Sequence, residues 1–124
     1  MVRSRPVFLS LVHIGMPVGA LVSILHRVSG LCLVVGTPGC IYLLDLSLRG
    51  PQEFGQVREL FNLTTVRMAS VMFTWVLAHH VLAGLRHLLS DIDIGARLPQ
   101  ARRSAWFVNA GALMLASLCA GVWL

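Results

Sequence analysis

The sequence has few charged residues. Ten basic and five acidic side chains make up 12% of the 124 residues, whereas 56% are hydrophobic and the mean hydropathy is +0.79. A soluble domain of this length has less apolar sequence than that. The composition therefore predicts a membrane protein, and the length fits one domain over residues 1–124.

Cysteine is also scarce. Cys32, Cys40 and Cys119 are odd in number, lie in apolar runs and form no CxxC pair. This pattern excludes a disulfide framework, a thiolate zinc site and a cysteine cluster for iron-sulfur ligation. No glycine-rich flavin or dinucleotide fingerprint occurs either. We expect the three cysteines to be small packing residues.

What the chain does have is three long apolar runs. A helix needs about 20 apolar residues to cross the hydrocarbon of a membrane, and the runs cover about 21–46, 66–89 and 104–124. The first contains Gly36, Pro38 and Gly39, which predict a kink tolerated by a neighbouring helix. Between the first two runs, "SLRGPQEFGQVRELFN" holds a Gly-Pro pair and predicts a solvated loop. The sequence therefore predicts an all-α membrane protein with three transmembrane helices.

The distribution of arginine predicts the orientation of these helices. With the N-terminus and the second loop on one side, seven arginines face three: Arg3, Arg5, Arg27, Arg86, Arg97, Arg102 and Arg103 against Arg49, Arg58 and Arg67. The positive-inside rule then places the N-terminus in the cytoplasm, with Phe8–Ile14 along that interface and Trp106 and Trp123 in opposite interfacial belts. Topology thus accounts for the basic surplus, and no soluble basic module remains to bind nucleic acid.

The second run ends in a stripe of polar and small residues. At about 100° per residue, His80, Gly84, His87 and Asp91 fall on one narrow helix face. Glycine has no side chain, so it would let a flat macrocycle or another backbone approach this face. The stripe therefore predicts a binding surface.

The spacing of the two histidines on this stripe restricts the chemistry. His80 and His87 are about 10 Å apart along a helix axis, too far to clamp one metal ion. A haem iron needs one axial histidine from each side, and His80 lies about 9 Å deeper than Arg86, so His80 is the candidate ligand. The alternative is a hydrogen bond between helices. His79 points about 100° away and is expected to contact a partner.

A second cluster, "SILHRVSG", opens the first run. Ser23 and Arg27 are four residues apart and share a helix face, while His26 lies one turn beyond Ser23. Their hydroxyl and guanidinium groups can donate hydrogen bonds to a carbonyl of a quinone. Alternatively, Arg27 marks the cytoplasmic boundary and Ser23 bonds its own helix backbone. Spacing alone leaves both interpretations open.

Three motifs in this order resemble the cytochrome b subunit of succinate dehydrogenase, the large membrane anchor of respiratory complex II. They are "RPVFLSL" from Arg5, "SILHRVS" from Ser23 and "HVLAGLRHLLSD" from His80. Ser90 and Asp93 depart from the usual family pattern, which bears on the local fit to the iron-sulfur subunit.

The resemblance implies an electron-transfer subunit in a bacterial inner membrane. His80 would be an axial ligand of haem b, Ser23 and Arg27 would line a site for ubiquinone or menaquinone, and His26 and Arg27 would stand near the haem propionates. The implied partners are a flavoprotein subunit, an iron-sulfur subunit and a second, small three-helix anchor that completes the helical bundle and supplies the other axial histidine. The chain alone would have no activity.

Several alternatives remain at this point. A quinol:fumarate reductase anchor has the same architecture, and a haem-free helical anchor or assembly protein would use its histidines only for hydrogen bonds between helices. A small transporter would show paired broken helices, whereas here a single span contains proline. Intrachain ligation by His26 and His80 is compatible with their similar depths.

Overall fold

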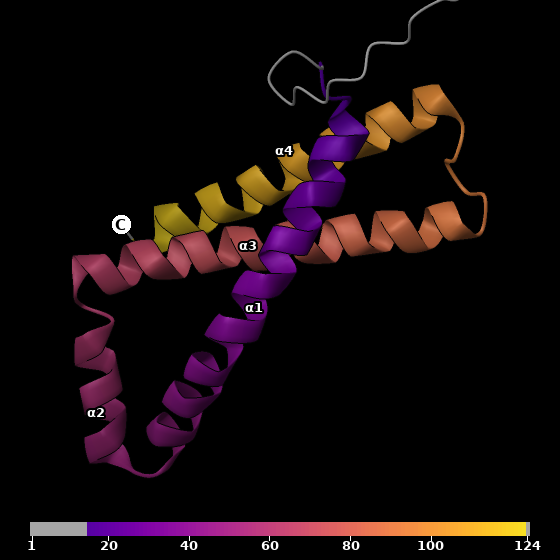
Figure 1. Cartoon of the computed structure of the whole chain (residues 1–124). Helices are drawn as coiled ribbons and strands as arrows, with labels where there is room; N and C mark the ends of the chain where they lie inside the picture. Colours follow the sequence, from indigo (N-terminus) through magenta and orange to yellow (C-terminus); the bar gives the residue numbers. More distant parts are fainter. Residues whose placement is uncertain (1–14, 124) are drawn as a thin grey trace, which may run out of the picture.

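The computed structural model describes residues 15–123, which form four helices and no strand. They are α1 (Val18–Leu48), α2 (Pro51–Leu60), α3 (Thr64–Asp91) and α4 (Leu98–Trp123). Figure 1 shows α3 and α4 running alongside each other, with α1 crossing them obliquely. Helices α1, α3 and α4 are long and apolar enough to span a membrane. The prediction of an all-α protein with three spans is confirmed.

Each membrane-spanning helix starts earlier in the chain than its predicted apolar run. The difference is largest for α4, which begins at Leu98 instead of residue 104. Pro99 fits the first turn because the amide groups there have no partner within the helix. Hydropathy marks only the part that crosses hydrocarbon, whereas helical hydrogen bonding continues into the polar interface, where Arg102 and Arg103 lie exposed.

The predicted loop between the first two spans is wrong, because it contains helix α2. Pro51 occupies the first helical position, and Glu53 and Arg58 lie in the first and last turns, where their charges complement the helix dipole. The Gly-Pro pair therefore marks a helix start. Figure 1 shows α2 running across α3 and not along it, at the end of the bundle where α1 finishes.

Small residues dominate the interior where the three long helices meet. Val22, Ala83, Ala105 and Val108 form the buried cluster, with contributions from α1, α3 and α4. In lipid there is no hydrophobic driving force between helices, so van der Waals packing stabilises their association. Small side chains let the helices approach closely enough for this packing. Most of the large apolar side chains lie instead on the outer surface. This inverted distribution suits lipid or further membrane helices as the surroundings.

Helix α1 continues through Pro38. A Cβ atom at Gly36 would lie 2.6 Å from the ring of Phe73 on α3, so a neighbouring helix does pack beside the proline, as expected. The kink itself stays a prediction. The cysteines agree only in part with the expected role as packing residues, because Cys119 is half-buried whereas Cys32 and Cys40 are exposed.

The first half of α1, the end of α3 and the start of α4 lie at the same end of the bundle. A guanidinium nitrogen of Arg86 on α3 lies 3.4 Å from a Cβ placed at Gly19 on α1, and Arg86 also hydrogen-bonds Ser104 on α4. The two polar clusters found in the sequence are therefore neighbours in space. The motif at Arg5 and the segment Phe8–Ile14 lie outside the described residues.

Candidate functional site

The imidazole of His80 contacts helix α1 through its Nδ1 atom. Nδ1 lies 3.1 Å from the carbonyl oxygen of His26 and 3.1 Å from the hydroxyl of Ser29. A carbonyl only accepts hydrogen bonds, so in the tautomer that bonds the His26 carbonyl Nδ1 is the donor and Nε2 presents its lone pair. Metal-binding histidines commonly donate their second ring N–H to a carbonyl in this way. The contacts of Nδ1 therefore orient the His80 ring, and its role as a ligand stays a prediction.

Two glycines make room for the imidazole rings between α1 and α3. A Cβ atom at Gly30 would lie 3.0 Å from Cε1 of His80, and one at Gly84 would lie 3.3 Å from Nε2 of His26. The close approach predicted beside Gly84 is therefore real, but the group that makes it is a side chain of α1.

His26 stacks on His80, with ring centroids 4.3 Å apart and ring planes inclined by 17°. Two axial ligands lie end to end across a metal at about 2 Å from each nitrogen, which puts their centroids more than about 6 Å apart. The stacked pair does not have that arrangement. Intrachain ligation by His26 and His80 would require the two rings to separate from this stacked position.

The rest of the stripe leads from this pair toward the end of α3. The ring of His87 lies 5.2 Å from that of His26 and is half-buried, while Asp91 is exposed. His80 and His87 thus both adjoin His26 at different depths. The helix face predicted from the sequence is the one that meets α1.

Ser23 and Arg27 share a face of α1 at the same end of the bundle. Ser23 is half-buried and Arg27 is exposed. Ser70 and Ser90 bond a carbonyl of their own helix, whereas Ser23 makes no such bond within residues 15–123. The part of the chain that the structure describes therefore shows no backbone bond for the Ser23 hydroxyl, and its role as a quinone ligand stays a prediction.

The prediction that His79 contacts a partner is wrong. His79 is only 1% exposed, and its ring lies against Trp75 with centroids 5.6 Å apart. It shares a face of α3 with buried Val76 and Ala83. This face turns into the interior of the chain itself. Among the described residues neither ring nitrogen makes a hydrogen bond of good geometry, although the side chain of Asn109 on α4 lies close enough to interact with the ring.

Ser29 is a buried polar residue beside the candidate site for which the sequence predicts no role. Ser29 is 3% exposed, and its hydroxyl donates to the carbonyl of His26 at 2.9 Å while lying beside Nδ1 of His80. The available signal was its position, one turn after His26, where a serine hydroxyl commonly bonds a backbone carbonyl. Tertiary packing brings His80 of α3 to the same His26 carbonyl.

Comparison with known proteins agrees with the resemblance seen in the motifs. Residues 1–119 match the family described as succinate dehydrogenase/fumarate reductase transmembrane subunit. The chain is 31% identical over 121 residues to the succinate dehydrogenase cytochrome b556 subunit of Coxiella burnetii, covering 97% of this chain and 96% of that protein. It is 30% identical over 115 residues to the subunit of the same name from Paracoccus denitrificans, covering 93% and 88%.

These matches run through all three spans, and with the length and hydropathy of the helices they identify an integral membrane protein. They include both polar clusters, from Ser23 to Ser29 and from His80 to Asp91. The chain belongs to the succinate dehydrogenase/fumarate reductase transmembrane subunit family.

Proposed function

We propose that this chain is the haem b-binding membrane anchor of a succinate:quinone oxidoreductase, in which electrons pass from the iron-sulfur subunit to a membrane quinone. The proposal rests on the position of His80, whose Nδ1 lies within hydrogen-bond distance of the His26 carbonyl. With Nδ1 as the donor of this bond, Nε2 would be left to bind a metal. The names of the two relatives, both cytochrome b556 subunits, support it.

The residues around His80 fit a haem. His80 would be an axial ligand, and His26 and Arg27 would stand near the propionates. The haem would supply a one-electron carrier. Ser29 and the His26 carbonyl would hold the orientation of the His80 ring, while the His26 ring packs against the rings of both His80 and His87. The second axial histidine would come from another chain.

The quinone site of the proposal uses Ser23 and Arg27. Their hydroxyl and guanidinium would donate hydrogen bonds to a carbonyl of ubiquinone or menaquinone, at the end of α1 that also holds His26. With the N-terminus in the cytoplasm of a bacterium, this end faces the side on which the iron-sulfur and flavoprotein subunits would dock. The exposed apolar surfaces of α1 and α4 leave room for lipid and for a second three-helix anchor.

A quinol:fumarate reductase anchor is the second candidate, because the family description covers both enzymes. The direction of electron flow depends on the quinone and on redox centres in other subunits. The names of the two relatives favour succinate oxidation.

The test of the proposal is purification of the complex from its own membrane through an affinity tag on this chain. We expect co-purifying flavoprotein, iron-sulfur and small anchor subunits, together with a reduced b-type haem spectrum. The same subunits without haem absorption would identify a haem-free anchor, and the absence of flavoprotein would contradict the proposal as a whole.

We expect Ser29→Ala to weaken haem binding without abolishing it. The substitution removes the hydroxyl beside Nδ1 of His80 but keeps the carbonyl that accepts its proton. Loss of an outer-shell partner commonly costs 10–100-fold in metal affinity, and we expect about tenfold here because one partner remains. Haem per flavin during detergent washing measures the loss, and the haem midpoint potential should shift with it.

Ser47→Ala is the matched control, because the hydroxyl of Ser47 also bonds a carbonyl three residues earlier in α1, but near the opposite end of the helix. It should leave both haem content and potential unchanged. Identical haem retention and potential in the two variants would show that Ser29 does not position His80.

A further inference from the structure

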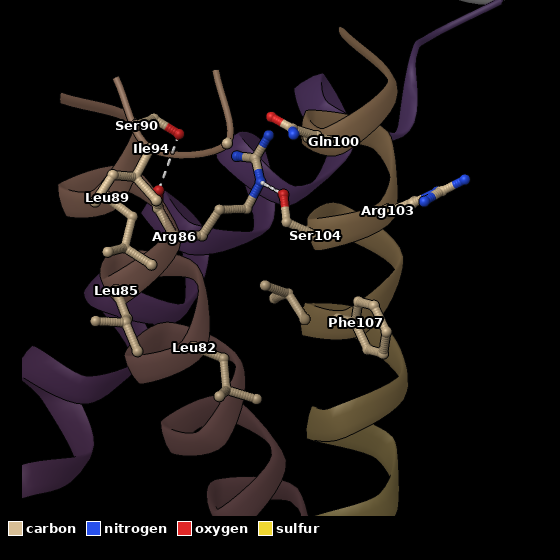
Figure 2. A pocket seen from close by; sticks show the side chains of 12 residues that line it. Leu82, Leu85, Arg86, Leu89, Ser90, Ile94, Gln100, Arg103, Ser104 and Phe107 are labelled. Carbon is tan, nitrogen blue, oxygen red and sulfur yellow. Dashed lines mark hydrogen bonds between the residues drawn. The ribbon is translucent and has the colours of Figure 1, made fainter. Parts of the chain in front are cut away.

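A groove runs between the end of α3 and the start of α4, with a volume of about 510 Å³. Leu82, Leu85 and Leu89 of α3 form one wall, and Phe107 and Val108 of α4 form the other (Figure 2). We call it the α3–α4 groove. Its apolar walls can hold a hydrocarbon chain.

The groove lies on the opposite side of α3 from the histidine stripe. Counted from His80 at about 100° per residue, Leu82, Leu85 and Leu89 fall at about 200°, 140° and 180°. No residue of α1 lines it. A ligand in this groove would therefore be separate from the proposed haem and quinone sites, and the inference goes beyond the proposed function.

Arg86 brings a positive charge to the polar end of the groove. Figure 2 shows its side chain reaching from α3 to α4, between Gln100 and Ser104. Its Nε donates to the Ser104 hydroxyl at 3.1 Å and one terminal nitrogen donates to the Ala101 carbonyl at 3.4 Å. Within residues 15–123, no carboxylate lies within ion-pair distance of Arg86. Among these residues the half-buried guanidinium has neutral partners only, and it keeps N–H groups that can donate to an anion.

Depth and charge together select the ligand. Arg86 lies six residues, or about 9 Å, nearer the end of α3 than His80, so it sits close to the level of lipid head groups. A guanidinium pairs with phosphate oxygens through parallel hydrogen bonds. Arg103 also borders the groove from α4, with its guanidinium directed away from Arg86 (Figure 2). A quinone has hydrocarbon but no negative charge to match Arg86.

We propose that the α3–α4 groove binds an anionic phospholipid. Its phosphate pairs with Arg86, and one acyl chain lies between the leucines of α3 and Phe107 of α4. The lipid would tie the end of α3 to the start of α4 on the side of the chain away from the proposed cofactor sites.

The test measures binding of phosphatidylglycerol and phosphatidylcholine to the purified, delipidated complex by native mass spectrometry. The wild-type complex should bind phosphatidylglycerol more tightly. Arg86→Gln should lower the affinity for phosphatidylglycerol about fivefold, the effect of one cation on an anionic lipid, and leave the affinity for phosphatidylcholine unchanged. Arg102→Gln is the matched control, because Arg102 is exposed near the same end of α4 but does not line the groove.

A second variant keeps the charge and fills the space. Leu89→Trp narrows the groove beside an intact Arg86, so it should also weaken binding of phosphatidylglycerol. If the Arg86→Gln complex fails to assemble, this variant tests the proposal in its place. Equal affinities for the two lipids, or equal losses in Arg86→Gln and Arg102→Gln, would overturn the proposal. So would a structure of the complex with a polypeptide segment in the groove.

Discussion

His80→Ala should reduce the b-type haem absorption of the purified complex to background. His80 is the proposed axial ligand on the α3 stripe, and its Nδ1 lies 3.1 Å from both the His26 carbonyl oxygen and the Ser29 hydroxyl. Alanine offers no ligand in its place, and neither His79 nor His87 can substitute, because His79 faces the interior of the chain and His87 lies two turns away. The measurement is the reduced-minus-oxidised spectrum, scaled to the flavin content of the sample.

His87→Ala is the control for this variant. It removes an imidazole from the same stripe that also adjoins His26, and it should keep the haem spectrum. His79→Ala should keep it as well in whatever complex assembles, although the cavity left at this buried position lowers stability. A full haem spectrum in His80→Ala would sink the ligand assignment, whereas loss of both flavin and haem would indicate failed assembly.

Ser23→Ala and Arg27→Leu should impair quinone reduction and spare succinate oxidation by an artificial soluble acceptor. A neutral hydrogen bond contributes about 0.5–1.5 kcal/mol and one to a charged group about 1.5–3 kcal/mol. If these bonds are made to the quinone, kcat/KM for quinone should fall about 2–10-fold in Ser23→Ala and about 10–100-fold in Arg27→Leu. Steady-state assays with both acceptors measure the difference.

The control is Arg49→Leu, near the opposite end of α1, where Arg49 pairs with Asp45 at 2.6 Å. Both arginines are exposed on the same helix, so a general effect of losing a surface charge would appear in both variants. Arg49→Leu should leave quinone reduction intact. Unchanged quinone kinetics in Arg27→Leu would remove Arg27 from the quinone site, and an equal fall with both acceptors would point to loss of the soluble subunits.

Much of the fold was predictable because membrane helices are encoded locally. Runs of about 20 apolar residues predicted α1, α3 and α4, and the 3.6-residue repeat placed His80 and Gly84 on a single face of α3. Helix α2 was missed because a Gly-Pro pair breaks a preceding helix and also begins a following one. Only the residues after Pro51, with an acid early and a base late, distinguish the two cases.

The candidate site was predictable only in part, because its contacts join residues more than 50 positions apart. The sequence itself determined three spans, a helix face bearing His80, and Ser23 next to Arg27 on a second face. Tertiary structure alone decided that His79 is interior, that His26 stacks on His80, and that Ser29 shares a carbonyl with the His80 ring. Backbone geometry fixes which residues of one helix share a face. Which neighbour that face contacts depends instead on how closely α1 and α3 cross. Gly30 and Gly84 allow a close crossing because they have no side chains.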